Sequence, residues 1–276
     1  MSLDYAIHSD FLIYCTGKDI DNEYDKQWHE SEKSETKKSC NVTEKYLKRL
    51  LDILNYGIWM TLENDSPSCI NGTSIKVPPT PMSCFTELKL SESRQHAKQY
   101  GRLGIGFKRP FVLRRFGRPV VYYGFNKDKK KDKFLEQCIQ QLEDKNLLNF
   151  FKPMSGGKKL NYGFYAESEW RILYFEELLT KGLIKNPRDP TNVKEYSYFQ
   201  KLTSDEQDKL RFLIPLDKWL SIIIYPSHDV KDRAQHELHD TMRDIIKEIK
   251  KTNRSQITVE NLDWPIELYL DACRNF

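Results

Sequence analysis

The sequence predicts an α+β fold in which a mixed or antiparallel central sheet is flanked by helices. Short apolar runs typical of buried strands recur along the 276 residues, and two longer segments carry apolar residues at helical spacing. The strand-like and helix-like segments do not alternate regularly, whereas a doubly wound parallel sheet requires such alternation. No internal repeat is visible. We therefore expect a single domain over residues 1–276, with charged insertions near 18–42 and 185–208.

The first expected elements are a strand and a helix. The apolar run Phe11–Cys15 is followed by a Thr-Gly pair, which favours a strand that ends in a turn. Residues 18–42 are rich in charge and have no period, so they predict an exposed insertion. Thr43 is then expected to cap a helix with leucines at helical spacing, and Gly57 is expected to end it.

The middle of the chain predicts three short strands and two helices. Apolar runs favour strands at 82–86, 103–107 and 119–124. A short helix is expected over 91–100. A long polar helix is expected to begin in the lysine run at 127 and to reach about 150.

The last part of the chain predicts further strands and one amphipathic helix. The helix is expected over 230–251, where apolar residues recur at helical spacing. Residues 185–208 are charged and irregular, which indicates the second insertion. Strands are expected at 163–175, 212–215 and 219–225, and near 257.

Composition narrows the class of function. A net charge of +4 is well below that of a dedicated nucleic-acid-binding domain. No apolar run approaches the roughly 18 residues of a membrane span, and the first residues lack the cationic and apolar regions of a signal peptide. These features predict a cytoplasmic protein. The six cysteines form no C-x-x-C pair. His236 and His239 are three residues apart and no motif indicates a third ligand for them, so we expect no metal site.

The first candidate site lies at the end of the first strand. Tyr14 and Thr16 place an aromatic ring and a hydroxyl where a strand meets a loop, which is a usual position for ligand contacts. The alternative is a plain strand end before a glycine turn.

The second candidate site is the segment from Phe85 and Thr86 to the glycine-rich stretch 100–107. The glycines follow the order G-x-x-G-x-G, so the dinucleotide fingerprint G-x-G-x-x-G is excluded. Glycines at alternate strand positions indicate the close approach of another backbone or of a ligand. Tyr100 begins this stretch.

A basic stretch follows directly. Five cations and no acid lie between Lys108 and Arg118, and Arg109 is the candidate closest to the glycines. Arginine binds phosphate or pyrophosphate bidentately. The alternatives are a solvated basic face and a nucleic-acid contact, which would depend strongly on salt.

The third candidate site is the run Glu167-Ser-Glu169-Trp-Arg171. On a strand, the period of two places both glutamates and the arginine on one face, while Trp170 and Ile172 anchor the other. Two carboxylates beside a guanidinium can hold one acid ionised and perturb the other. The alternative is an ion pair on a strand surface, which contributes little.

These segments together resemble a known family. The blocks 84–87, 100–107 and 118–122 are similar to the C-F-T-E, Y-G-x-x-G-I-G-F and P-V-x-Y succession of the AbiGi abortive-infection proteins. The block 167–172 resembles an E-x-E-W-R-I run that related uncharacterised bacterial proteins share. The resemblance implies a component of an anti-phage system, and some members are labelled antitoxins of a two-component pair.

An enzyme hypothesis follows by analogy at the level of the fold. ADP-ribosyltransferases use a polar residue of the first strand, a middle strand that shapes the nicotinamide pocket and a late glutamate. In this analogy Glu169 would stabilise an oxocarbenium-like ribose while NAD loses nicotinamide. Tyr14 stands where that family has His or Arg. The catalytic candidates are Glu169, Glu167 and Arg171, and the cofactor candidates are Tyr14, Thr16, Phe85, Thr86, Tyr100 and Arg109.

A binding hypothesis competes with it. In this hypothesis the chain is a non-catalytic antitoxin or regulatory partner of a toxin, and its charged loops and the 230–251 helix contact a protein. Glu167, Glu169 and Arg171 would then form a structural network. Neutral substitution of these residues would change stability and would abolish no turnover.

Overall fold

A computed structural model describes residues 11–22, 35–62, 69–70, 73–74, 77–87, 92–123, 137, 140–153, 168–251 and 263–275. The chain divides into two compact units. Unit 1 comprises 1–58, 87–111 and 215–276, and unit 2 comprises 59–86 and 112–214. The strand pairs of both units are mostly antiparallel and several helices accompany them, which confirms the α+β prediction. The expectation of a single domain stays a prediction.

Unit 1 is built on four neighbouring strands. Their order is β1 (Phe11–Thr16), β6 (Leu103–Lys108), β12 (Leu220–Tyr225) and β13 (Ile266–Tyr269). The first three are antiparallel, and β13 runs parallel to β12. The expected strands 11–15, 103–107 and 219–225 are confirmed within two residues at each end. The strand expected near 257 lies outside the described residues.

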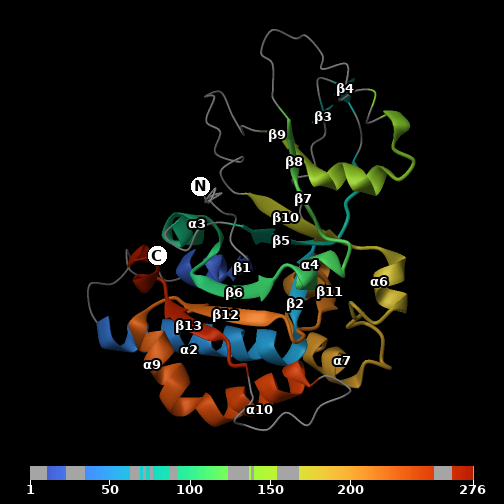
Figure 1. Ribbon diagram of the computed structural model, residues 1–276. Coiled ribbons are helices and arrows are strands. Elements are labelled where there is room, and N and C mark those ends of the chain that lie inside the picture. The colour runs from blue at the N-terminus through green and yellow to red at the C-terminus, as the bar shows by residue number, and fades with distance from the viewer. Residues whose placement is uncertain are drawn as a thin grey trace. The chain divides into compact units, whose positions relative to one another are not determined.

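Helices cover the two faces of these strands (Figure 1). On one face lie α2 (Glu35–Tyr56), α9 (His228–Glu237) and α10 (His239–Lys250). On the other lies α3 (Ser93–Tyr100), where Ala97 joins a cluster with Ile13, Ile222 and Ile224. The side chains of β1 and β12 therefore enter apolar layers on both faces of the sheet.

The glycines of β6 lie close to side chains of the neighbouring strand β12. A Cβ on Gly106 would lie 2.9 Å from the Cβ of Ile222, and one on Gly104 would lie 3.1 Å from the Cβ of Ile224. The close approach predicted from the alternating glycines is therefore made by isoleucine side chains of the neighbouring strand.

Unit 2 centres on β5 (Met82–Thr86) and β10 (Glu169–Leu173), which pair along their whole length. β2 (Ile58–Thr61) and β11 (Leu210–Ile214) follow β5 on one side, and β7 (Arg118–Pro119) pairs with β10. The strand expected over 82–86 has the predicted bounds. The strand expected over 163–175 is shorter, and its residues 163–167 lie outside the described part.

Smaller elements complete unit 2. β8 (Val121–Tyr123) pairs in parallel with β9 (Phe151–Pro153), and η2 (Lys145–Phe150) precedes β9. Four short helices belong here or at its border: α4 (Pro110–Leu113), α6 (Glu176–Thr180), α7 (Val193–Phe199) and α8 (Ser204–Lys209). Two-residue strands lie at Cys69–Ile70 (β3) and Thr73–Ser74 (β4), and η5 (Ala272–Asn275) closes unit 1.

Parts of the two predicted insertions are helical. Residues 18–22 are helical, and α2 begins at Glu35, so Thr43 lies inside the helix and does not cap it. The buried stripe around Leu50 stabilises the helix, which extends from it into the polar residues before Thr43. In 185–208, α8 begins at a capping box of Thr203 and Glu206.

Two predicted long helices are interrupted. The 230–251 segment forms α9 and α10, which meet at Leu238 (φ −118°, ψ 0°). The helix expected to reach 150 ends at 141, because the Asp144 side chain accepts a hydrogen bond from the backbone N–H of Asn146 and starts η2. The strand expected over 119–124 is split at Val120, whose N–H donates to the carbonyl of Glu169.

Candidate functional site

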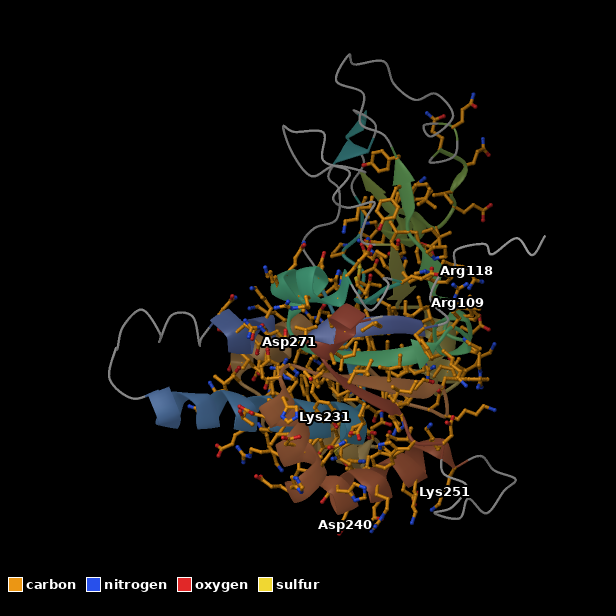
Figure 2. The ribbon with its side chains drawn as sticks, turned by 60° about the vertical axis from the view of Figure 1, so that its left-hand side comes forward. Arg109, Arg118, Lys231, Asp240, Lys251 and Asp271 are labelled. Carbon is orange, nitrogen blue, oxygen red and sulfur yellow. The ribbon has the colours of Figure 1, made fainter. Side chains whose placement is uncertain are left out.

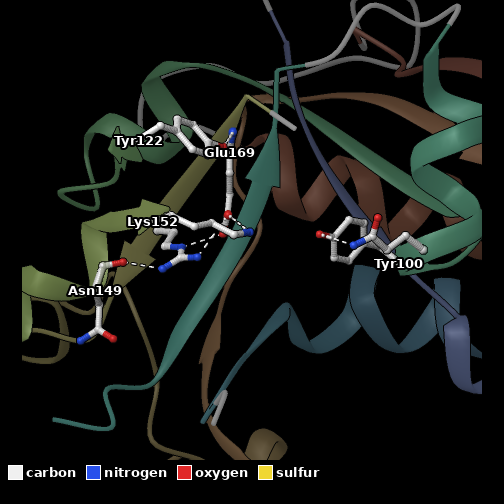
Figure 3. Close-up of polar contacts among 7 residues, drawn as sticks. Tyr100, Tyr122, Asn149, Lys152 and Glu169 are labelled. Carbon is white, nitrogen blue, oxygen red and sulfur yellow. Dashed lines mark hydrogen bonds and ion pairs between the residues drawn. The ribbon is translucent and has the colours of Figure 1, made fainter. Parts of the chain in front are cut away.

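Glu169 lies at the centre of a buried polar cluster in unit 2 (Figure 3). One carboxylate oxygen accepts from Nε of Arg171 at 2.6 Å, and the other accepts from Nη2 of Arg171 at 3.1 Å. Nζ of Lys152 donates to the second oxygen at 2.9 Å. Only 7% of Glu169 and 9% of Arg171 are exposed. The ion pair is therefore internal, which excludes the alternative of a pair on a strand surface.

The neighbouring elements hold the backbone of Glu169 in place. Its N–H donates to the hydroxyl of Tyr122 at 3.0 Å, and its carbonyl accepts from the N–H of Val120 at 2.8 Å. Both partners lie at β8, so the entry of β10 is fixed on this side. Ser168, directly before Glu169, has a φ of 43°, which is uncommon for a residue with a side chain.

The guanidinium of Arg171 is held at a third point. Its Nη1 donates to the carbonyl of Asn149 at 2.5 Å. Asn149 is itself buried, and its amide donates to Oγ1 of Thr80 at 3.1 Å and to the carbonyl of Asn146 at 2.9 Å. The end of η2 thus provides a rigid acceptor for Arg171.

The cluster fixes the charge of Glu169. Burial raises the pKa of its carboxyl, but the charges and hydrogen bonds of Arg171 and Lys152 outweigh burial and lower the pKa to about 2. Glu169 is therefore ionised at neutral pH, and both of its oxygens are occupied by donors. Such a carboxylate is poorly suited to accept a proton, because its basicity is low.

This pKa predicts a dependence of stability on pH. The folded pKa is lower than the ordinary value, so the contribution of Glu169 is complete above about pH 5 and is lost as the pH falls toward 2. A shift of this size corresponds to about 3 kcal/mol. We expect the melting temperature of wild type to fall more steeply between pH 5 and 2.5 than that of Glu169→Gln. Parallel curves for the two proteins would contradict this account.

Thr86 and Phe85 lie beside the same cluster. Thr86 is opposite Glu169 and Phe85 is opposite Trp170 in the β5–β10 ladder, and both β5 residues are at most 3% exposed. The sequence predicted that Phe85 and Thr86 line a cofactor pocket. The structure places them in the interior of unit 2, next to the predicted catalytic pair. Glu167, the third catalytic candidate, lies outside the described residues.

The first-strand candidates lie in unit 1. Oγ1 of Thr16 accepts from Nη1 of Arg49 at 3.2 Å, and Arg49 forms an ion pair with Asp19 at 2.7 Å. The hydroxyl of Tyr46 donates to Asp21 at 2.6 Å and lies 3.2 Å from the carbonyl oxygen of Gly17. The hydroxyl of Thr16 is thus part of the polar contacts that fix the turn after β1, while Tyr14 is half-buried in the strand.

Tyr100 and Arg109 also belong to unit 1. The ring of Tyr100 packs against His96 with centroids 4.4 Å apart, and its hydroxyl accepts from the amide of Gln99 at 3.1 Å (Figure 3). Arg109, labelled in Figure 2, forms an ion pair with the buried carboxylate of Glu87. Unit 1 therefore holds Tyr14, Thr16, Tyr100 and Arg109, and unit 2 holds Phe85, Thr86, Glu169 and Arg171.

The basic stretch 108–118 is not a uniform charged strip. Arg115 is 2% exposed, and its Nε donates to the carbonyl of Leu183 at 3.2 Å. Arg109 is neutralised by Glu87. Arg114 and Arg118 are exposed. Two of the five cations therefore support the fold itself, which leaves fewer for a phosphate than the sequence indicated.

Lys152 and Asn149 complete the cluster around Glu169, and sequence reasoning missed both. They lie 17 and 22 residues from their partners along the chain, and no motif connects them with the E-x-E run. The sequence offers only a weak signal for Lys152. It is a charged residue that stands between the apolar residues at the end of the predicted helix and Pro153.

Comparison with known proteins locates the family resemblance. A family model described as putative abortive phage resistance protein AbiGi, antitoxin, matches residues 60–160. The resemblance to AbiGi is confirmed over this segment. It covers just over a third of the chain and includes the 84–87, 100–107 and 118–122 blocks. The 167–172 block lies beyond it, and its kinship stays a prediction. No curated protein and no solved structure matches the chain.

The AbiGi match points to a component of a phage-resistance system of the abortive-infection type. The described part of the chain shows neither a membrane-spanning helix nor a cluster of metal ligands. None of its helices has the length and apolar character needed to cross a membrane. Among the same residues, no group of three or more His, Cys, Asp or Glu side chains is arranged to hold a metal ion.

Proposed function

We propose that this chain is a non-catalytic antitoxin that acts by binding a protein toxin in an abortive-infection system. The observation that carries the proposal is the AbiGi match, whose description names an antitoxin. An antitoxin requires a folded surface for its partner and no turnover. The competing ADP-ribosyltransferase hypothesis requires a carboxylate whose negative charge is available to a substrate.

The surroundings of Glu169 support the binding role. Its carboxylate lies between Arg171 and Lys152, so one negative charge faces two positive charges. The two positive charges largely cancel the electrostatic potential of the carboxylate. It would therefore stabilise an oxocarbenium-like ribose only weakly. Removal of the charge should therefore change the stability of unit 2 and leave chemistry untouched.

The test is expression of the chain with and without its neighbouring gene. Wild type is compared with Glu169→Gln and with the surface variant Asp271→Asn, whose acid forms an exposed ion pair with Arg94 outside the 230–251 segment. We expect wild type to be harmless alone and to suppress the toxicity of the neighbour. Glu169→Gln should protect in proportion to the amount of folded protein that it leaves, and Asp271→Asn should protect fully.

The opposite result would support the enzyme hypothesis. In that case wild type alone is toxic and consumes NAD, while Glu169→Gln is inactive although it is as abundant and as stable as wild type. A melting curve for each variant separates loss of chemistry from loss of folded protein, because only the structural role lowers the melting temperature.

A further inference from the structure

Phe116 adopts a backbone conformation that aromatic residues rarely take. Its φ is 58°, in the left-handed region. It follows α4, where its N–H donates to the carbonyl of Leu113 at 3.1 Å and the N–H of Gly117 donates to the carbonyl of Val112 at 3.0 Å. This pair of bonds is a Schellman motif, in which the left-handed residue is usually glycine.

The glycine of this motif stands one position later. A Cβ on Gly117 would lie 2.2 Å from Cγ1 of Val112 and 3.0 Å from Cγ1 of Ile172, so packing requires glycine there. The left-handed conformation then falls on Phe116, whose Cβ makes it unfavourable. Residues held in such conformations cluster at ligand clamps and other functional sites.

The ring of Phe116 is half-buried, so part of it is exposed to solvent. It meets the ring of Phe175 edge-on, with centroids 6.1 Å apart. Leu113, three residues earlier, is 43% exposed. Together they form a small apolar area at the surface of unit 2. Aromatic side chains in such areas are common anchors of protein interfaces.

Two arginines flank Phe116 in the sequence, and one lysine lies over its ring. Arg114 and Arg118 are exposed and lie two residues before and after Phe116, and Arg118 is labelled in Figure 2. Nζ of Lys181 lies 5.7 Å from the centre of the Phe116 ring. We call this set the Phe116 surface; its members are Leu113, Arg114, Phe116, Arg118, Phe175 and Lys181.

We propose that the Phe116 surface docks a segment of the toxin in which an apolar side chain is flanked by acidic residues. This inference rests on the proposed antitoxin function and assigns its contact surface. The apolar centre accepts the apolar side chain, and the arginines at the rim attract the acids and increase the association rate.

A protein partner fits better than a nucleic acid. Glu176 and Glu177 follow Phe175 at the start of α6 and are exposed, and Glu177 forms an ion pair with Lys181. These two acids repel a continuous row of phosphates, on which the affinity for nucleic acid depends, whereas a protein segment can place its acids beside Arg114 and Arg118 and away from α6. A mixed rim around an apolar centre is typical of protein interfaces.

The test measures binding of the full chain to the toxin that wild type neutralises. Phe116→Gly removes the ring and also the unfavourable conformation. We expect a melting temperature equal to or above that of wild type, and affinity for the toxin roughly tenfold weaker or worse. A second variant, Arg114→Glu with Arg118→Glu, should weaken binding and reduce its salt dependence. Its control is Lys48→Glu with Lys98→Glu, an equal charge change at two exposed lysines of unit 1 that lie outside the segments of the binding hypothesis.

The outcomes separate this inference from the proposed function. If Phe116→Gly and the double arginine variant bind and protect like wild type, the Phe116 surface is not the contact and the antitoxin function stands. If wild type does not protect, both fail. If a single-stranded oligonucleotide binds the chain through Phe116 more tightly than the toxin does, the inference is overturned in favour of a nucleic-acid surface.

Discussion

Gly101→Ala is expected to destabilise unit 1 by about 4 kcal/mol or more. Gly101 ends α3 with φ 113° and ψ 159°, a region that is almost restricted to glycine. An added Cβ would lie 2.3 Å from both the carbonyl carbon and the oxygen of Thr16, and 2.5 Å from the amide nitrogen of Gly17. These are backbone atoms of the turn after β1, so no side-chain movement relieves the clash. For a chain of this size the melting temperature should fall by roughly 10 °C.

Gly182→Ala is the matched control. Gly182 also has a positive φ, 66°, but no atom lies within 4 Å of its added Cβ. Its replacement should cost only about 1 kcal/mol, the penalty of alanine in the left-handed region. If both variants have the same melting temperature, the conformational penalty dominates and the close packing of Gly101 on the Thr16 turn is unimportant. A large difference identifies that contact as the cause.

The same contact shows what the sequence could and could not predict. The alternation predicted close approach at Gly104 and Gly106, and both are such points; Gly101, which lies outside the alternation, is a third. Their neighbours could not be named, because Thr16 and Ile222 are brought beside them only by strand order. A glycine signals space that is needed, and the fold decides whether a ligand, a backbone or a side chain occupies it.

Strands were easier to predict than helix limits. The 82–86 strand has its predicted bounds, since its apolar run is short and begins directly after Pro81. Helix α2 begins eight residues before the expected cap at Thr43, because packing around Leu50 extends the helix into polar sequence. The cap of α8 could have been predicted, since Thr203 and Glu206 have the spacing of a capping box.

Only the part of the candidate site that lies within a single strand could be predicted. The alternation of a strand places Glu169 and Arg171 on one face, and they form the expected pair. Their burial was not predictable, because charged residues are usually exposed unless partners distant in sequence cover them. Lys152 and the carbonyl of Asn149 are such partners.

Arg171→Met should destabilise unit 2 by about 3–5 kcal/mol, because it leaves the Glu169 carboxylate buried with Lys152 as its one remaining cation among the described partners. Thermal unfolding should show a melting temperature lower by roughly 10 °C. The exposed variant Arg233→Met removes a pair of the same type, with Glu237, and should cost about 0.5 kcal/mol. The contrast between them measures the effect of burial.

The double variant Glu169→Leu with Arg171→Met distinguishes a structural pair from a catalytic one. Removing both charges avoids an uncompensated buried ion, so the double variant should be more stable than Arg171→Met alone, and the two substitutions should be coupled by about 2 kcal/mol. The long side chain of Lys152 can then carry its amine toward solvent. If this variant folds and still suppresses the toxin, Glu169 has no role in chemistry. If it folds like wild type and has lost all activity in cells, the carboxylate acts on a substrate and the antitoxin proposal is wrong.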